Sequence, residues 1–540
     1  MDLILYNGRI ISMDTSNPEG TAVAVKDGMI VKVGEQNEVL LLRSSETELI
    51  DLQGKMLVPG FNDSHMHLLS FGYSLQKVNL AGTSNMEELI DRTKSFADSK
   101  GIGLDQWILG RGWNNDHFDV KNFPTRYDLD KISTENPICL TRACGHVSIV
   151  NSRALELCGI NRDTRQVDGG HFDLDEKGEP LGIFKETAMQ LIYDNIPAPD
   201  IEEIKAMIID ASHRAVAEGI TSIQSDDFEA LPCKDFNKVI QAYTELKESK
   251  ELPLRIYEQC LLPSMDRLQN FLDQGYHTGY GDEYFKIGPL KLLGDGSLGA
   301  RTAYLCQPYA DDPSTSGIPV FTQEELDLLV VTAHNAGMHV AIHCIGDKIM
   351  YMAFESIEKA QQQNPRKDHR HSIIHCQITD EVLLDKYRDL DVIAHVQPIF
   401  IDYDLHMVAS RVGEERSKTT YNWKSLLDRG VHVACGSDCP VEPFNVLPTI
   451  YTAVTRKDLK GYPENGWLPY QKLTVEEALH CFTAGAAYAS FEEEIKGSLA
   501  PGKLADMVLL SQDLYEIHPD HIKDVQVEMT FVGGKLVYQR

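Results

Sequence analysis

Two histidines stand one residue apart in the stretch FNDSHMHLL, residues 61–69, directly after an apolar run. On a β-strand, residues i and i+2 point to the same face, so the rings of His65 and His67 would share one side of the strand. Two neutral imidazoles on one face can begin a site for a divalent metal ion. Such pairs also arise by chance, so the interpretation needs further ligands from elsewhere in the chain.

Two later strand-like segments carry more histidines. GMHVAIHC contains His339 and His343, and RHSIIHC contains His371 and His375. Each pair is four residues apart, which on a strand is about 13 Å and too far to share one ion. Because barrel chemistry lies at the C-terminal ends of the strands, we expect His343 and His375 to be ligands and the earlier histidines to be core or bottom-face residues. Asp438, in ACGSDCP, would lie at the same end.

A lysine interrupts the apolar stretch PLKLL. In its ordinary interpretation, Lys291 buries its stem and extends its charge to solvent. A buried lysine also loses its charge readily, and its neutral amine can take up carbon dioxide to become a carbamate that bridges two metal ions. Asp295 is the other candidate from this segment, as a ligand or as a contact to the substrate. Lys286 lies on the opposite face of the strand and is the weaker alternative.

These residues need elements that bring strand ends together. Strand-like runs alternate with amphipathic helix patterns, which predicts a parallel sheet, and eight such runs predict an α/β fold with a (β/α)8 barrel. The runs are KMLVPGFNDSHMH, GITSIQS, LPLRIYEQCLL, YFKIGPLKLL, GMHVAIHCIG, RHSIIHCQI, DVIAHVQP and GVHVACGSD. The stretch KLTVEEALHCFTAG between the last run and the C-terminal part contains a capping box, Thr474 with Glu477.

The two ends of the chain resemble each other. Residues 1–58 and 490–540 show short alternating strands, with hairpin signals at Asn7-Gly8, Asp27-Gly28 and Gly533-Gly534. Neither end is long enough to bury a core alone. We therefore predict one small β-sandwich domain built from both termini.

The barrel would occupy residues 59–489, with a long insertion at about 70–200 after its first strand. We expect the insertion over the barrel mouth, where it would shape the substrate pocket; a structural flap without substrate contact is the alternative. Candidate substrate contacts are Trp113 as a pocket wall, His146, and Gln397 at the end of the seventh run.

Composition excludes several classes of protein. The formal charge of −30 disfavours nucleic acid and anionic membranes as partners. The N-terminus lacks a signal-peptide pattern, and no apolar run reaches the roughly 18 residues of a membrane span. The 11 cysteines include no C-x-x-C pair, which indicates reduced thiols and a cytoplasmic location. Large barrels often form dimers, so a homodimer is kept open, although no residue identifies an interface.

The motifs VPGFNDSHMHLL, KLLGDGSLGARTA, AIHCIGD, SIIHCQI, CGSDCPVEP and GSLAPGKLADMVLL together resemble the amidohydrolase superfamily. The resemblance is closest to its YtcJ-like branch, which includes N-substituted formamide deformylases, and it extends through GRGWN and GHVSIVNSRAL in the insertion. It implies a barrel with one or two divalent metal ions, usually zinc, held by His65, His67, Lys291, His343, His375 and Asp438. The chain has Ile374 where many members have a glutamate before the sixth-strand histidine, which we interpret as a difference beside the metal and not as a lost ligand.

This ligand set predicts hydrolysis of a C–N bond in a small non-peptide substrate, such as an N-formyl, N-acyl or cyclic amide. Metal-bound hydroxide would attack the carbonyl carbon, and Asp438 would pass the proton to the leaving nitrogen. The alternatives are a metal-dependent deaminase of the same superfamily, which would usually hold one metal and no lysine ligand, and a non-catalytic barrel that binds or regulates. A barrel that no longer catalysed a reaction would be expected to have lost metal ligands, whereas all six positions here hold a residue that can bind a metal ion. A serine or cysteine hydrolase is disfavoured, because no G-x-S-x-G motif occurs.

Overall fold

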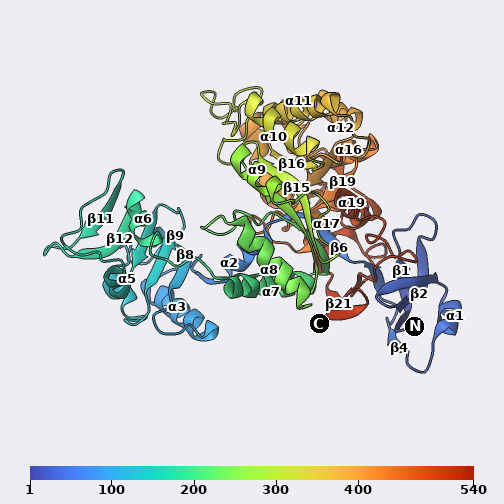
Figure 1. Ribbon diagram of the computed structural model, residues 1–540, viewed down its shortest axis with the longest axis horizontal. Coiled ribbons are helices and arrows are strands. Elements are labelled where there is room, and N and C mark those ends of the chain that lie inside the picture. The colour runs from blue at the N-terminus through green and yellow to red at the C-terminus, as the bar shows by residue number, and fades with distance from the viewer. The chain divides into compact units, whose positions relative to one another are not determined.

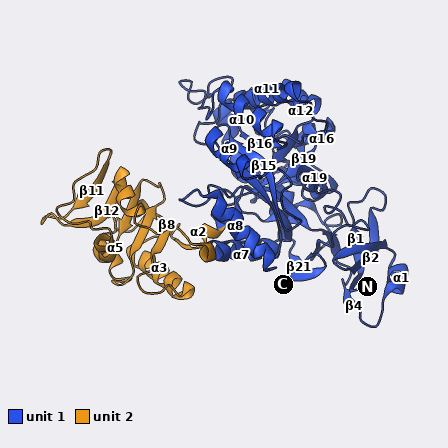
Figure 2. Cartoon of the chain, viewed as in Figure 1, with its two compact units in different colours: residues 1–71, 204–540 blue, residues 72–203 orange.

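The computed structural model describes residues 1–540. The chain forms two compact units (Figure 2): residues 1–71 together with 204–540, and residues 72–203. The first unit contains the candidate metal ligands. No helix in either unit is both long and apolar enough to cross a membrane.

Eight parallel strands carry the candidate ligands (Figure 1). They are β6 (Phe61–Met66), β13 (Ile220–Ser225), β14 (Arg255–Leu261), β15 (Phe285–Leu293), β16 (Val340–Cys344), β17 (Ser372–His375), β18 (Ile393–Val396) and β19 (Val433–Cys435). Each strand pairs with the next in chain order. Backbone hydrogen bonds of 2.8 Å, from Asp438 N to His65 O and from His67 N to Cys439 O, join the segment after β19 to β6. The sheet is therefore a nearly closed barrel, and the eight predicted runs are its eight strands.

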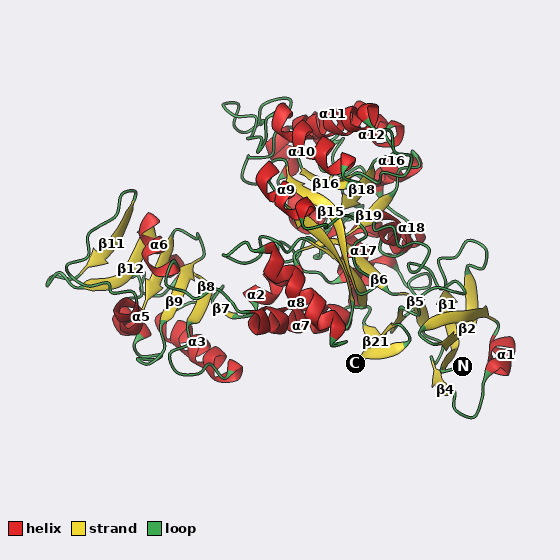
Figure 3. Ribbon diagram, in the orientation of Figure 1, coloured by secondary structure: helices red, strands yellow, loops and turns green.

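Helices connect the strands and cover the outside of the sheet (Figure 3). The main ones are α7 (Ile201–Ala217), α8 (Phe236–Glu248), α9 (Met265–Asp273), α10 (Gln323–Asn335), α11 (Asp347–Gln363), α12 (Glu381–Asp389), α16 (Trp423–Asp428), α17 (Val446–Thr455), α18 (Val475–Cys481) and α19 (Ala484–Ala489). The predicted capping box of Thr474 and Glu477 begins α18. The eight barrel strands are apolar along much of their length. One face of each strand packs against the helices and the other faces the barrel interior, so both faces are buried.

A second sheet of eight strands joins the two ends of the chain. Its strands are β1 (Leu3–Ile11), β2 (Glu19–Lys26), β3 (Met29–Gly34), β4 (Glu48–Asp51), β5 (Met56–Pro59), β20 (Met507–Leu510), β21 (Val527–Val532) and β22 (Lys535–Gln539). The junction lies where β5 pairs antiparallel with β20, and apolar residues from both ends share one core. The union of the termini was expected, but the strands form one continuous sheet, so the predicted two-layered sandwich is not confirmed.

The three predicted turns have different outcomes. Asp27-Gly28 connects β2 to β3, and Gly533-Gly534 connects β21 to β22. The hairpin predicted at Asn7-Gly8 is wrong, because β1 continues through these residues with a register shift between Tyr6 and Ile10. A Cβ on Gly8 would lie 2.6 Å from Leu52 Cδ1, so this glycine allows a close approach within the sheet and not a turn.

Residues 72–203 fold around a six-stranded sheet of their own. Its strands are β7 (Lys77–Asn79), β8 (Ile108–Trp113), β9 (Ile138–Arg142), β10 (Val147–Val150), β11 (Gly170–Leu174) and β12 (Pro180–Glu186), and helices α3 (Met86–Lys100) and α5 (Ser152–Leu157) accompany them. Two apolar clusters form the interior of this unit. The segment is thus a folded unit between β6 and β13, and its position over the barrel mouth stays a prediction.

Candidate metal centre

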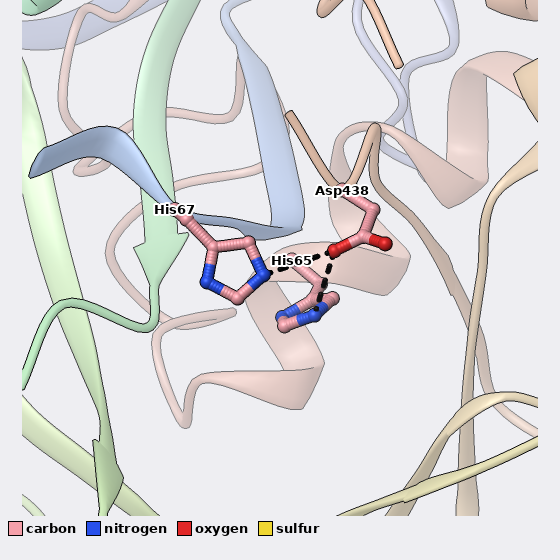
Figure 4. Close-up of side chains that lie close together, drawn as sticks. All are labelled: His65, His67 and Asp438. Atoms are coloured by element: carbon pink, nitrogen blue, oxygen red, sulfur yellow. Dashed lines mark hydrogen bonds and ion pairs between the residues drawn. The ribbon is translucent and has the colours of Figure 1, made fainter. Parts of the chain in front are cut away.

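The two histidines of the first barrel strand meet the aspartate that follows the last one (Figure 4). His65 Nε2 lies 3.2 Å and His67 Nε2 lies 3.1 Å from Asp438 Oδ1. Their possible ligand atoms all lie within 4.8 Å of one another. One metal ion could therefore contact all three side chains, since zinc binds imidazole nitrogen and carboxylate oxygen at about 2.0–2.2 Å.

The other three predicted ligands adjoin this cluster. Lys291 Nζ lies 3.3 Å from His65 Nε2. The His375 ring lies 5.7 Å from the His65 ring, and the His343 ring lies 4.3 Å from the His375 ring, measured between centroids. All six side chains thus gather at the ends of β6, β15, β16 and β17 and after β19, the end of the barrel at which its chemistry is expected.

The second ring nitrogen of three of these histidines is held by an oxygen acceptor. The pairs are His65 Nδ1 with Gln259 Oε1 at 2.7 Å, His375 Nδ1 with Gln397 Oε1 at 2.8 Å, and His67 Nδ1 with the carbonyl O of Asp226 at 3.1 Å. Because these acceptors carry no proton, Nδ1 of each ring carries a hydrogen, so Nε2 is the nitrogen that offers a lone pair to a metal ion when the ring is neutral. The same arrangement orients histidine ligands in metal sites, so the donor set fits a divalent ion.

Burial keeps most of these groups uncharged. Burial, followed by the charge of Lys291, lowers the pKa of His65 to about 3 and that of His343 to about 4. Burial and the neighbouring His343 lower the pKa of His375 well below its ordinary value. Burial also lowers the pKa of Lys291. Neutral imidazoles bind metal ions, which suits these histidines as ligands, and a lowered pKa favours the neutral amine of Lys291 that reacts with carbon dioxide.

His67 is the exception among the histidines. Burial acts on it too, but the hydrogen bond to Asp438 and the charge of Asp226 outweigh burial and raise its pKa to about 9. Asp438 shows the converse effect: burial favours its neutral form, yet the neighbouring His65 and His67 hold its pKa well below the ordinary range. Without a metal ion, this cluster therefore contains a protonated imidazole beside an ionised carboxylate at neutral pH.

Asp295 lies beside His343, with Oδ1 3.4 Å from His343 Nε2, and its carboxylate is also bonded to the backbone. It accepts hydrogen bonds from the backbone N–H groups of Tyr304 (2.8 Å), Ile345 (3.1 Å) and Gly346 (2.8 Å). It thereby ties the loop after β15 to the start of α11. Lys291, and not Asp295, is the residue of this segment that lies beside His65.

Three more residues were predicted to contact the substrate, and each lies in a different environment. Gln397 uses its Oε1 on His375, which makes it a positioning residue, and its buried Nε2 has no hydrogen-bond partner. Trp113 is fully buried in the core of residues 72–203 and donates its indole N–H to Leu140 O at 2.9 Å, so its assignment as a pocket wall is not supported. His146 is exposed in the same unit beside Glu186, and its contact with substrate stays a prediction.

Three residues of the centre were missed in the sequence. Asp226 directly follows β13, so the rule that located Asp438 at a strand end would also have found it. Asp63 stands two residues before His65 on the same face of β6, and its carboxylate accepts from the N–H of His65 and of Ser437, each at 3.1 Å. Gln259 lies inside β14, where an isolated glutamine gives no signal of its partner.

Comparison with known proteins adds three findings. The model of the amidohydrolase family matches residues 48–538. The chain is 32% identical to the putative amidohydrolase YtcJ of Bacillus subtilis over 100% of both chains, and 26% identical to the N-substituted formamide deformylase of Arthrobacter pascens over 100% of this chain and 98% of that protein. An uncharacterized metal-dependent hydrolase from Pyrococcus furiosus superimposes with a TM-score of 0.77 at 30% identity, covering 96% of this chain and 99% of the other.

Proposed function

The chain belongs to the amidohydrolase family and is a metal-dependent hydrolase, and from this premise we propose that it hydrolyses the C–N bond of a small N-formyl or N-acyl amide. The observation that carries the proposal is the cluster of His65, His67 and Asp438, with Lys291 Nζ 3.3 Å from His65 Nε2. The likeness to a protein named as a formamide deformylase supports this choice of substrate over other hydrolysable bonds.

We assign one or two divalent ions, zinc in first place, to the six side chains His65, His67, Lys291, His343, His375 and Asp438. Held there, such an ion supplies Lewis acidity and lowers the pKa of water that binds to it. The lowered pKa of Lys291 supports its conversion to a carbamate, which would add an anionic ligand to an otherwise mostly neutral set.

Asp438 is the proposed proton carrier. Its Oδ1 contacts His65 in β6 and His67 directly after that strand, whereas its Oδ2 makes no hydrogen bond within the protein. The low pKa of the metal-free state keeps this carboxylate ionised at neutral pH, which is the form that a proton acceptor must have. Asp438 would take a proton from the attacking water and deliver it to the leaving nitrogen, a role typically worth about 10²–10⁴ in rate.

The neighbouring amides have a positioning role. Gln259 and Gln397 hold the rings of His65 and His375, so Nε2 of each ring faces the reaction centre. Fixed side chains of this kind keep the ligands within the narrow tolerance that catalysis requires. A small-molecule substrate is part of the proposal, whereas the homodimer and the cytoplasmic location stay predictions.

The test is hydrolysis of a panel of N-formyl and N-acyl amines by protein loaded with zinc in bicarbonate buffer. We expect release of the amine and of formate or another carboxylate, and loss of this activity in Asp438→Asn. Ammonia release from amino-heterocycles without cleavage of any amide would reject the proposal in favour of a deaminase.

A further inference from the structure

A cavity of about 190 Å³ opens among the loops that follow β15 to β19. Each loop contributes to its wall: Ser297 after β15, Ile345 after β16, Gln377 after β17, Phe400 after β18 and Val441 after β19. Four of the strands that lead into these loops, β15, β16, β17 and β19, also carry or precede a candidate metal ligand. The cavity is therefore at the reactive end of the barrel.

One wall of the cavity is apolar and touches the metal centre. The ring of Phe400 stacks on the ring of His375, with 5.9 Å between centroids and 19° between planes. Leu298, Met407 and Val441 extend the apolar surface from Phe400. An apolar group bound along this wall would lie directly beside a bond held at the metal centre.

Two polar side chains on the wall have no partner in the protein. Gln377 is only 3% exposed, yet its side-chain amide makes no hydrogen bond. Glu442 forms neither a hydrogen bond nor an ion pair, although it is partly buried. Because both side chains line the cavity and neither is bonded within the protein, their polar atoms are available to a molecule that enters it.

The surroundings of Glu442 are acidic. Burial, followed by the charges of Asp402, Asp404 and Asp438, raises its pKa to about 7. The first two of these carboxylates are occupied: Asp402 accepts a backbone N–H at 2.6 Å, and Asp404 accepts the hydroxyl of Tyr421. Asp404 also lines the cavity and bonds Tyr421 through Oδ2 alone, whereas Glu442 makes no hydrogen bond, which leaves Glu442 the more available carboxylate in a field that attracts cations.

We propose that this cavity binds the side chain of the substrate, and that this side chain is a short apolar arm that ends in a cation. Phe400 packs against the arm, Glu442 pairs with the cation and determines specificity, and Gln377 supplies a further polar contact. The inference rests on the proposed function, because the arm must be attached to the amide that is cleaved. The volume is below the roughly 300–1,000 Å³ of pockets for drug-sized ligands, so the arm is a few carbon atoms long.

Two isosteric substrates test this proposal. Both are N-formyl amines with a propyl arm, one ending in guanidinium and the other in the neutral urea analogue. Guanidinium stays protonated and cannot coordinate a metal ion, so the pair has the same shape and differs in the charge at the end of the arm and in one N–H donor group that becomes a carbonyl acceptor. We measure kcat/KM for both with zinc-loaded protein at pH 8.5, where Glu442 is ionised.

We expect a preference of about tenfold or more for the guanidinium arm, the usual size of a hydrogen bond to a charged group. Glu442→Gln should reduce this preference to about twofold or less. Glu464→Gln is the matched control. Glu464 is exposed and makes no ion pair, and its substitution changes the net charge by the same amount as Glu442→Gln. It should keep the wild-type preference, which excludes a general effect of the acidic surface.

A binding measurement separates failure of this proposal from failure of the proposed function. Calorimetry on the same zinc-loaded protein compares free propylguanidinium with propylurea. Hydrolysis of both formamides without a preference, or a preference that survives Glu442→Gln, would overturn the cation site and leave the amidase. If neither formamide is cleaved but propylguanidinium binds about tenfold more tightly, the cation site stands and the amidase fails. Equal binding without hydrolysis would overturn both.

Discussion

Lys291 Nζ lies 3.3 Å from Nε2 of His65 in the interior of the barrel, and neither residue is appreciably exposed. A metal ion on that imidazole nitrogen would place a second positive charge beside the ammonium group. Two cations so close in a buried site repel strongly, so metal binding requires the lysine to be neutral or converted to an anion. This relationship connects the metal content of the protein to the chemical state of one lysine.

The first prediction compares two histidines, His65 and His339, that lie at different depths along the barrel axis. His65→Ala removes a side chain of the metal cluster, so we expect loss of bound metal and a fall in kcat/KM of about 10³ or more. His339→Ala is the matched control, because His339 is bonded to the hydroxyl of Tyr257 at 2.9 Å and to Arg370 O at 3.0 Å, apart from the cluster. It should lower stability but retain metal. Equal metal loss in both variants, measured by plasma mass spectrometry, would refute the assignment by strand depth.

The second prediction concerns the carbamate. Protein prepared with ¹³C-bicarbonate should show a carbamate carbon signal by NMR, and Lys291→Ala should lack it. The variant should also bind one metal ion fewer and recover activity when a short carboxylate such as acetate is added, because the added anion can replace the missing ligand. Lys286→Ala is a control on the same strand, since Lys286 pairs with Glu492 at 2.8 Å. A carbamate signal that persists without Lys291 would contradict the account.

The third prediction is proton release on metal binding. His67 has a raised pKa of about 9 and is protonated at pH 6 without metal, whereas His65 and His343 have lowered pKa values of about 3 and about 4 and are neutral. Because a metal ion binds only the neutral imidazole, His67 should release about one proton when a metal ion binds it at pH 6, and Lys291 adds to the release to the extent that it is still an ammonium. Apparent affinity should rise by up to about tenfold per pH unit until the pH approaches the pKa of His67.

Calorimetry in bicarbonate-free buffers of different ionisation enthalpy counts these protons. Bicarbonate is omitted because carbamate formation would release a proton of its own. His67→Gln should release correspondingly fewer protons at the same pH. Proton uptake in the wild-type protein, or a release unaffected by His67→Gln, is the opposite of what the hydrogen bond to Asp438 predicts.

The fourth prediction concerns the amide behind His375. Gln397→Ala removes the acceptor of the His375 Nδ1 proton, so the ring is no longer held with Nε2 towards the centre. Metal affinity should fall about 10–100-fold, the usual effect of losing such a partner. Gln269→Ala, at an exposed glutamine of α9, serves as the control. Competition with a zinc-binding dye gives the affinities, and a Gln397→Ala value equal to the wild type would show that the ring needs no such support.

Much of the barrel could be predicted because its signals are local. Parallel strands buried on both faces appear as short apolar runs, and all eight were visible between helix patterns. The selection of His343 over His339 needed only the length of a strand and the rule that chemistry lies at its C-terminal end. The six proposed ligands could therefore be predicted from the sequence.

The remaining features depend on contacts between distant segments. Asn7-Gly8 has the composition of a hairpin turn, but β1 passes through it because β4 and β5 pair with successive parts of that strand. Gln259 is defined by a partner 194 positions away in the chain, and no local pattern reveals that contact. Trp113 could equally have been a pocket wall or a core residue, and only the packing of its own unit distinguishes these.

The metal content of the wild-type protein tests the central claim most directly. We would purify the protein in bicarbonate buffer without added chelator and measure metals per chain by plasma mass spectrometry. The account predicts zinc or another divalent ion at two equivalents per chain with carboxylated Lys291, and one equivalent without that modification. Protein that is folded but holds no divalent metal, even after incubation with zinc, would contradict the account.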